Sequence, residues 1–157
     1  MEKTNAIRAL DQKKIKFEIH YYDPDVAVSG NEVSKILNEE EPRVFKTLVT
    51  IGKTKKYYVF VIPTDKELDL KKAAKAAGEK NIEMIKSKEL LPLTGYIHGG
   101  CSPIGMKKLF KTFIHETALN YETIYISGGK RGIQIELNPN DLLKVVPIIT
   151  TDLVSDN

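Results

Sequence analysis

One lysine stands inside an otherwise apolar segment, "RVFKTLVTI" at residues 43–51, which has the composition of a β-strand. Side chains alternate between the two faces of a strand, so Lys46 shares its face with Val44 and Leu48. On an edge strand, such a lysine would discourage sheet-to-sheet association. The segment alone favours this interpretation, because surface lysines are common. In a cleft, its ammonium would instead meet a carbonyl or a phosphate, since burying an unpaired lysine costs free energy.

Glycines concentrate in two windows further along the chain. Seven of the ten fall within residues 95–105 and 128–132. Because glycine allows unusual dihedrals and a close approach to ligands, the windows are candidate walls of one site, with two tight turns as the alternative. Basic residues follow or lie within both windows, which fits a phosphate-bearing ligand and equally fits solvated lysines. Neither window is a Walker phosphate loop, since Arg131 follows Gly129-Lys130 where serine or threonine is required.

Cys101, the single cysteine, raises the question of nucleophilic catalysis. A thiolate needs a base or a positive field, which His98 could supply, but a lone cysteine in a loop is more often structural. The histidines at positions 20, 98 and 115 lack the paired spacing of a zinc site. We therefore expect neither a metal nor another cofactor.

The elements that must position these residues are predicted from periodicity and capping. Thr4 can cap a first helix, Ser29 and Glu32 form a capping-box pattern for a second, and Asn138 can cap a last one. The clearest helix covers 68–78. Strands are expected at 15–22, 43–51, 57–63, 121–127, 132–137 and 147–150. Residues 89–105 look like a loop with a short strand at "GYIH". Hairpin-like neighbours predict an α/β (α+β) domain with a mixed, mostly antiparallel sheet rather than a doubly wound one.

Composition limits the setting of this domain. A chain of 157 residues predicts one domain, 1–157, and 41% hydrophobic with 29% charged residues is usual for a soluble protein. The charged N-terminus lacks the apolar core of a signal peptide, and one cysteine cannot form an internal disulfide. These features predict a cytoplasmic protein without a membrane partner. The net charge of +3 is too small by itself to indicate nucleic-acid binding.

Four motifs in order resemble the YbaK/EbsC family of aminoacyl-tRNA deacylases over almost the whole chain. They are "FKTL" at 45–48, "LDLKKAAKAAG" at 68–78, "TGYIHGGCSPIGMKK" at 94–108 and "IYISGGKRGIQIEL" at 124–137. The resemblance implies a compact mixed sheet or pseudo-barrel with flanking helices, and editing in trans. The substrate would be the acceptor end of a mischarged tRNA, with prolyl-tRNA synthetase as a further partner. The best-known activity releases cysteine from mischarged prolyl-tRNA; relatives remove alanine or other small residues.

The resemblance also places the family's functional residues on this chain. The essential lysine falls on Lys46. Substrate-binding positions fall on Tyr22 (with Tyr21 adjacent), Thr47 and Ser127, and the glycine loop falls on Gly99 and Gly100. Two positions depart from the cysteine-specific pattern, because Ser29 replaces a phenylalanine and Gln134 replaces an aspartate.

The resemblance implies a mechanism in which the substrate attacks itself. The thiol of a cysteinyl ester would expel the tRNA hydroxyl as a cyclic thioester, while the protein fixes geometry and stabilises charge. Lys46 would hold the terminal adenosine, and amides around Gly99 and Gly100 would bind the carbonyl or oxyanion. Cys101 is then a bystander. A tRNA- or synthetase-binding module without catalysis is the alternative from another class.

Overall fold

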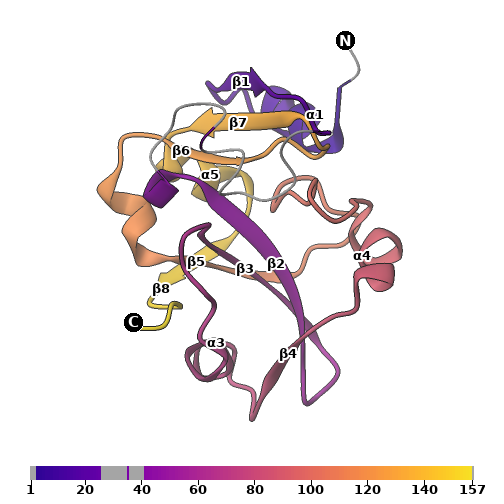
Figure 1. The fold of residues 1–157 in the computed structure, drawn as a ribbon, viewed down its shortest axis with the longest axis vertical. Helices are drawn as coiled ribbons and strands as arrows, with labels where there is room; N and C mark the ends of the chain where they lie inside the picture. The colour runs from indigo at the N-terminus through magenta and orange to yellow at the C-terminus, as the bar shows by residue number, and fades with distance from the viewer. Residues whose placement is uncertain (1–2, 26–34, 36–40, 157) are drawn as a thin grey trace.

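The chain folds around two β-sheets. The structure, a computed structural model, describes residues 3–25, 35 and 41–156. The smaller sheet is antiparallel, in the order β1 (Glu18–Tyr21), β7 (Ile133–Leu137), β6 (Ile124–Ser127). The larger is mixed, in the order β4 (Ile82–Met84), β2 (Phe45–Gly52), β3 (Tyr57–Pro63), β5 (Lys111–His115), β8 (Ile148–Thr151). Figure 1 shows the smaller sheet at the top and the β2–β3 hairpin running diagonally below it.

Short capped helices join and cover these strands. They are α1 (Asn5–Gln12), α3 (Leu70–Ala77), α4 (Ser87–Thr94) and α5 (Pro139–Val145), with 3₁₀ turns η1 (Glu41–Arg43) and η2 (Glu116–Asn120). The predicted caps are confirmed, because Thr4 accepts from the Ile7 amide and Asn138 from the Asn140 amide. No helix in the described ranges is long and apolar enough to cross a membrane.

The larger sheet separates two apolar clusters, and this decides which way each residue of β2 points. Phe45 and Val49 face the main core, which they share with α1, α5 and the inner face of the smaller sheet. Leu48 packs against the second cluster, around the stacked rings of Phe60 and Phe113 and the alanines of α3. The predicted alternation in β2 is therefore confirmed, and Lys46 lies on the face that carries Leu48.

Several expectations need correction. The sheets do not close into a barrel within the described residues. Residues 87–94 form α4 rather than a loop, although Pro92 removes one backbone donor, and "GYIH" is not a strand. A buried Leu90 and the left-handed Gly95 cap, at φ 86°, define this helix.

Two strands, β4 and β5, were not predicted. Strand β5 pairs in parallel with β3 and β8, and such long-range pairing leaves no hairpin signal in the sequence. Three-residue β4 is too short for a periodic signal. The capping-box helix expected after Ser29 lies outside the described residues.

Candidate active site at the open edge of strand β2

Strand β2 is paired along all of one side and only in part on the other. Thr64 donates its amide to the Val44 carbonyl at 2.8 Å, which makes this a hydrogen-bonded pair of the β2–β3 ladder. Bonded and non-bonded pairs alternate in antiparallel ladders, so Lys46 also bonds towards β3, whereas the backbone of Thr47 points the other way. On that side β4 pairs only with residues 50–52. Among the described residues, no strand pairs with β2 beside the Thr47 backbone, and we call this stretch the open edge of β2.

The two sheets meet beside this open edge. Val44 and Tyr125 form an isolated parallel bridge. Lys46 of β2 follows Val44 by two residues, and Ser127 follows Tyr125 by two residues in β6. Side chains two residues apart on a strand lie on the same face, so Lys46 shares the face of Val44 and Ser127 shares that of Tyr125. Ser127 is paired across the smaller sheet with Gln134. Ser127 and Gln134 are therefore cross-strand neighbours, and Lys46 stands two residues beyond the bridge that joins β2 to their sheet.

The two glycine-rich windows contact each other, which is the arrangement expected if they are walls of one site. A Cβ on Gly100 would lie 3.1 Å from the Lys130 Cα and 3.1 Å from the Arg131 backbone nitrogen. The Arg131 Nε donates to the His98 carbonyl at 2.9 Å. The close approach favours glycine at position 100, because a methyl group there would press on backbone atoms, which would have to shift by a few tenths of an ångström.

The amide of Gly100 is already used inside its own loop. It donates to the Ile97 carbonyl at 3.0 Å, and Gly99 takes a left-handed φ of 86°, as the third residue of a type II turn does. The Gly99 amide has no hydrogen-bond partner among residues 3–25, 35 and 41–156. Of the two amides predicted to bind the oxyanion, only that of Gly99 therefore remains a candidate donor.

The turn between β6 and β7 is held from several directions. The Ser127 hydroxyl accepts from the Gly129 amide at 3.2 Å. The Tyr22 amide donates to the Gly132 carbonyl at 3.0 Å, so Tyr22 borders this turn. Tyr22 is half-buried, whereas the neighbouring Tyr21 is 56% exposed. Tyr22 is thus the better placed of the two candidate tyrosines, and Ser29 lies outside the described residues.

Polar groups of the site lack partners. Within the described ranges, the Thr47 Oγ1 and Gln134 Oε1 atoms are buried without a hydrogen bond. Lys46 is half-buried, and none of the described residues forms an ion pair or hydrogen bond with it. A buried polar group without a partner costs about 1–3 kcal/mol. Such a cost is accounted for if a ligand supplies the missing partners.

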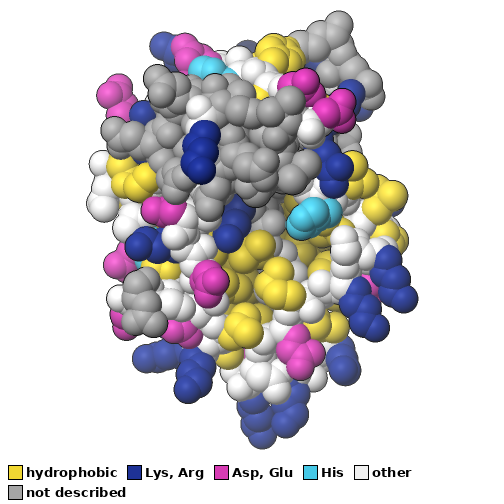
Figure 2. Space-filling view, in the orientation of Figure 1, with side chains coloured by type: hydrophobic (Ala, Val, Ile, Leu, Met, Phe, Trp, Pro, Cys, Tyr) yellow, Lys and Arg dark blue, Asp and Glu magenta, His cyan; other side chains and the backbone are white. Residues whose placement is uncertain are grey.

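The surface around β2 combines apolar and basic character. Figure 2 shows hydrophobic side chains gathered over β2, with basic and histidine side chains beside them. Nearby apolar side chains are well exposed, at 47% for Met84 and 50% for Ile97. This combination suits a ligand that has both an apolar and an anionic part.

Cys101 is placed as a structural residue. Its side chain is 8% exposed within the main core. Burial raises the pKa of the Cys101 thiol to about 12, and a hydrogen bond with Thr94 offsets only part of this. A thiol with this pKa is not ionised at neutral pH, which argues against the nucleophile interpretation.

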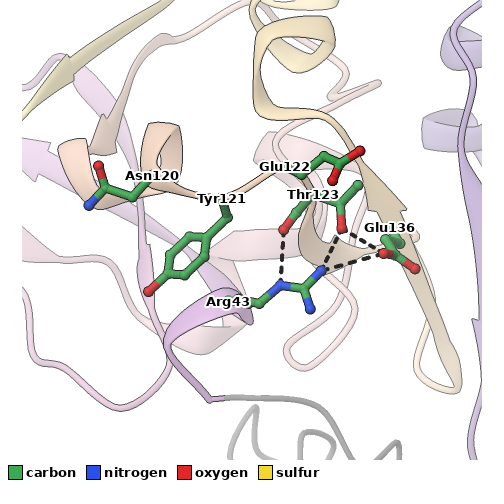
Figure 3. Close-up of a pocket in the computed structure, with 6 residues that line it drawn as sticks. All are labelled: Arg43, Asn120, Tyr121, Glu122, Thr123 and Glu136. Atoms are coloured by element: carbon green, nitrogen blue, oxygen red, sulfur yellow. Dashed lines mark hydrogen bonds and ion pairs between the residues drawn. The ribbon is translucent and has the colours of Figure 1, made fainter.

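A second polar cluster, which the sequence did not indicate, lies on the same face of the smaller sheet. Glu136 accepts from the Thr123 hydroxyl at 2.6 Å and bonds the His20 Nε2 at 2.9 Å. The Arg43 guanidinium lies 3.5 Å from the same carboxylate and over the ring of Tyr125, 5.1 Å from its centroid. Figure 3 shows Arg43 pointing at Thr123 and Glu136 from the entry to β2. This cluster ties the start of β2 to β7, three residues before Lys46.

The pocket beside this cluster has a volume of about 530 Å³ and is lined by Arg43, Asn120, Tyr121, Glu122, Thr123 and Glu136. Carboxylate and imidazole atoms of Glu18, His20 and Glu136 lie within 4.8 Å of one another, a spacing that could hold a cation. Glu136 is, however, already bonded to Arg43 and Thr123. We therefore interpret the cluster as an ion-pair network.

Replacing Glu136 by glutamine should lower the free energy of unfolding by about 1–3 kcal/mol, because a partly buried carboxylate loses its charge-assisted hydrogen bonds. Burial alone would raise the Glu136 pKa, but hydrogen bonds from Thr123 and His20 outweigh it and lower the pKa. A carboxyl group whose pKa is lower in the folded state stabilises the fold at pH values above its pKa in the unfolded state. This stabilisation is lost as the pH falls through the folded-state pKa.

Urea unfolding at several pH values measures this effect. The difference in free energy of unfolding between wild type and Glu136→Gln should be largest near pH 7 and should decrease below about pH 4. Glu122→Gln, an exposed neighbour in the same pocket, is the control and should unfold like wild type. A difference that does not change with pH would contradict the assignment.

Comparison with known proteins identifies the family of this chain. The family model described as the aminoacyl-tRNA editing domain matches residues 23–145. A relative from Enterococcus faecalis, provisionally named the Cys-tRNA(Pro)/Cys-tRNA(Cys) deacylase EbsC, is 48% identical over 145 residues, which cover 92% of this chain and 88% of that protein. A proline–tRNA ligase from Thermosipho africanus is 25% identical over 119 residues, covering 76% of this chain and 20% of the ligase.

Solved structures show the same fold. One described as a trans-editing enzyme for prolyl-tRNA synthetase superposes with a TM-score of 0.85 at 23% identity, covering 99% of both chains. A hypothetical protein superposes with a TM-score of 0.88 at 20% identity, covering 96% of this chain and 99% of the other. The chain therefore belongs to the aminoacyl-tRNA editing domain family and, within it, to the YbaK/EbsC group.

Proposed function

We propose that this protein is a trans-editing aminoacyl-tRNA deacylase, with cysteine on tRNA(Pro) as its first candidate substrate. The observation that carries the proposal is a set of polar groups that lack a partner among the described residues, namely Lys46 and Thr47 on β2 and Gln134 on β7. Gln134 follows a glycine-rich turn that contacts the other glycine-rich window, and the chain is 48% identical to EbsC over 145 residues. Because charged tRNAs are cytoplasmic, we propose that the protein acts in the cytoplasm.

The polar groups suggest a role for each residue. The Lys46 ammonium would hold the phosphate or ribose of the terminal adenosine as a point charge. The Gly99 amide would donate to the ester carbonyl as negative charge develops on its oxygen. Thr47, Ser127 and Gln134 would orient polar groups of the aminoacyl moiety, and Tyr22 would pack on it.

The chemistry needs no nucleophile from the protein when the substrate carries one. The cysteinyl sulfur forms a bond to the ester carbonyl carbon, and the bond from that carbon to the tRNA oxygen breaks. The thiol proton ends on the released tRNA hydroxyl, and water then opens the cyclic thioester to free cysteine. Holding the two groups together is worth several kcal/mol, up to about 10 in ideal cases.

A panel of charged tRNAs tests the proposal. Cysteinyl-, alanyl- and prolyl-tRNA(Pro) are incubated with the protein, and loss of the ester is followed over time. Faster release of cysteine supports the proposed substrate, whereas faster release of alanine assigns the site to another small residue. Binding of tRNA without release of any amino acid would favour the binding module. Repeating the panel with prolyl-tRNA synthetase present tests that partner.

Replacing Cys101 by serine should leave deacylation within about threefold of wild type, because the buried thiol is not ionised at neutral pH. Thiol-blocking reagents at neutral pH should be equally without effect. Loss of turnover in a folded Cys101→Ser protein would mean that the enzyme supplies its own thiol, and the substrate-assisted mechanism would be wrong.

A further inference from the structure

We propose that Arg131 is a positioning residue that orients and polarises the candidate oxyanion donor through the other end of the same peptide group. The Arg131 Nε donates to the carbonyl of His98 at 2.9 Å. That carbonyl and the amide of Gly99 belong to one planar peptide unit, in which they point in opposite directions. A group that fixes the carbonyl therefore fixes the direction of the N–H. The inference rests on the proposed function for its kinetic consequence, but not for its geometry.

The peptide held by Arg131 is the central one of a turn that has two alternative forms. The turn runs from Ile97 to Gly100 and is closed by their 3.0 Å hydrogen bond. With Gly99 at φ 86° it is of type II. In the type I form of the same turn, the central peptide is rotated by roughly half a turn, so its carbonyl and its amide exchange directions. Release of the His98 carbonyl would permit this rotation and turn the Gly99 amide away from the site.

The contacts around the glycines are consistent with a built clamp. A Cβ on Gly99 would lie 2.8 Å from the Arg131 Nε, so the guanidinium stem occupies the space that any larger residue would need. Gly100 packs on the backbone of Lys130 and Arg131, at 3.1 Å from an added Cβ. The two turns therefore pack against each other next to the hydrogen bond between Arg131 and the His98 carbonyl.

The bond also changes the strength of the donor. Hydrogen bonds to the carbonyl and from the amide of one peptide group polarise each other, and a charged donor makes the effect larger. With the guanidinium on the His98 carbonyl, the Gly99 N–H becomes a stronger donor to developing negative charge. The benefit is greatest in the transition state, so its loss should appear in kcat rather than in KM.

Two substitutions separate this role from simple attraction of tRNA phosphates. In glutamine the amide nitrogen is bonded to Cδ, as Nε is in arginine, so Arg131→Gln retains a donor at that position without the charge. Arg131→Lys retains the charge but has a methylene group at that position. The clamp predicts that Arg131→Gln keeps kcat within about threefold, whereas Arg131→Lys and Arg131→Ala lose about tenfold, a change of about 1.4 kcal/mol. Attraction of phosphate predicts the reverse order, with the loss in KM.

Matched variants and a second measurement complete the test. Lys130→Ala removes an exposed charge from the same turn and should leave kcat unchanged. Adding Gly99→Ala to Arg131→Ala should cost less than the sum of the two changes, because both release the same peptide. Amide hydrogen exchange of Gly100 should be faster in Arg131→Lys than in Arg131→Gln, since loss of the clamp loosens the turn.

The outcomes distinguish this inference from the proposed function. If wild type releases no amino acid from any tRNA, the proposed function fails, and hydrogen exchange alone still decides the clamp. If wild type is active and Arg131→Lys matches it in both kcat and Gly100 exchange, the clamp is refuted. If Arg131→Gln loses as much activity as Arg131→Ala while Arg131→Lys does not, Arg131 acts through its charge and the clamp is likewise refuted.

Discussion

Replacing Lys46 by alanine should reduce deacylation of cysteinyl-tRNA(Pro) by about 100-fold or more, while the protein remains folded. The reason is electrostatic. Removing one preorganised charged or donor group from a site of this kind typically costs a factor of about 100 to 1,000 in rate. Because no described residue pairs with the Lys46 ammonium, its loss breaks no internal ion pair. The urea midpoint should therefore stay close to that of wild type.

The control for this prediction is Lys53→Ala. Lys53 is an exposed lysine in the turn of the same hairpin, so the variant removes the same charge away from the open edge. It should retain turnover close to that of wild type. Near-normal turnover in Lys46→Ala would instead return Lys46 to the role of a charge that guards the open edge of β2 against pairing.

Replacing Gly100 by alanine should lower turnover by about tenfold or more, although only one methyl group is added. Its Cβ would lie 3.1 Å from backbone atoms of both Lys130 and Arg131, which have no side-chain freedom to move aside. The two glycine-rich turns must then separate by a few tenths of an ångström. Because a misplacement of about 1 Å in a catalytic constellation can cost 100-fold, a shift of this smaller size should cost about tenfold or more.

Gly78→Ala is the control for general destabilisation by an added methyl group. Gly78 ends α3 at φ 73°, and its added Cβ would have no heavy atom within 4 Å. Alanine at this position should lower the free energy of unfolding by only about 1–2 kcal/mol, because its backbone must take a left-handed conformation. It should lower stability without changing turnover per folded molecule. Equal turnover in Gly100→Ala and wild type would show that contact between the two turns is not needed for catalysis.

Local features of the sequence predicted most helices and hairpins, because their signals lie within a few residues. Thr4 and Asn138 are caps whose hydroxyl or amide oxygen meets an amide two or three residues onward. The alternation of β2 follows from the pleat of any strand. Helix α4 was missed because Pro92 is a strong local signal against it, and burial of Leu90 in the tertiary structure prevails. Strand β5 was missed because its partners are distant in the chain.

The sequence by itself determined which residue types are available to a site. It supplied a lysine inside a strand, two glycine-rich windows and a single cysteine. The motif order determined the family, since side-chain identity in a fixed order is what distinguishes one family from another. None of these properties depends on where distant segments lie in space.

Only the tertiary structure decided how those residues meet. The parallel bridge between Val44 and Tyr125 brings the strand that carries Lys46 against the strand that carries Ser127, although the two residues are about 80 positions apart in the chain. Burial made Cys101 inert, and a hydrogen bond within its own turn removed the Gly100 amide from the list of donors. The physical reason is that hydrogen bonds and burial are properties of neighbours in space. A sequence specifies these neighbours through the whole fold rather than through any local pattern.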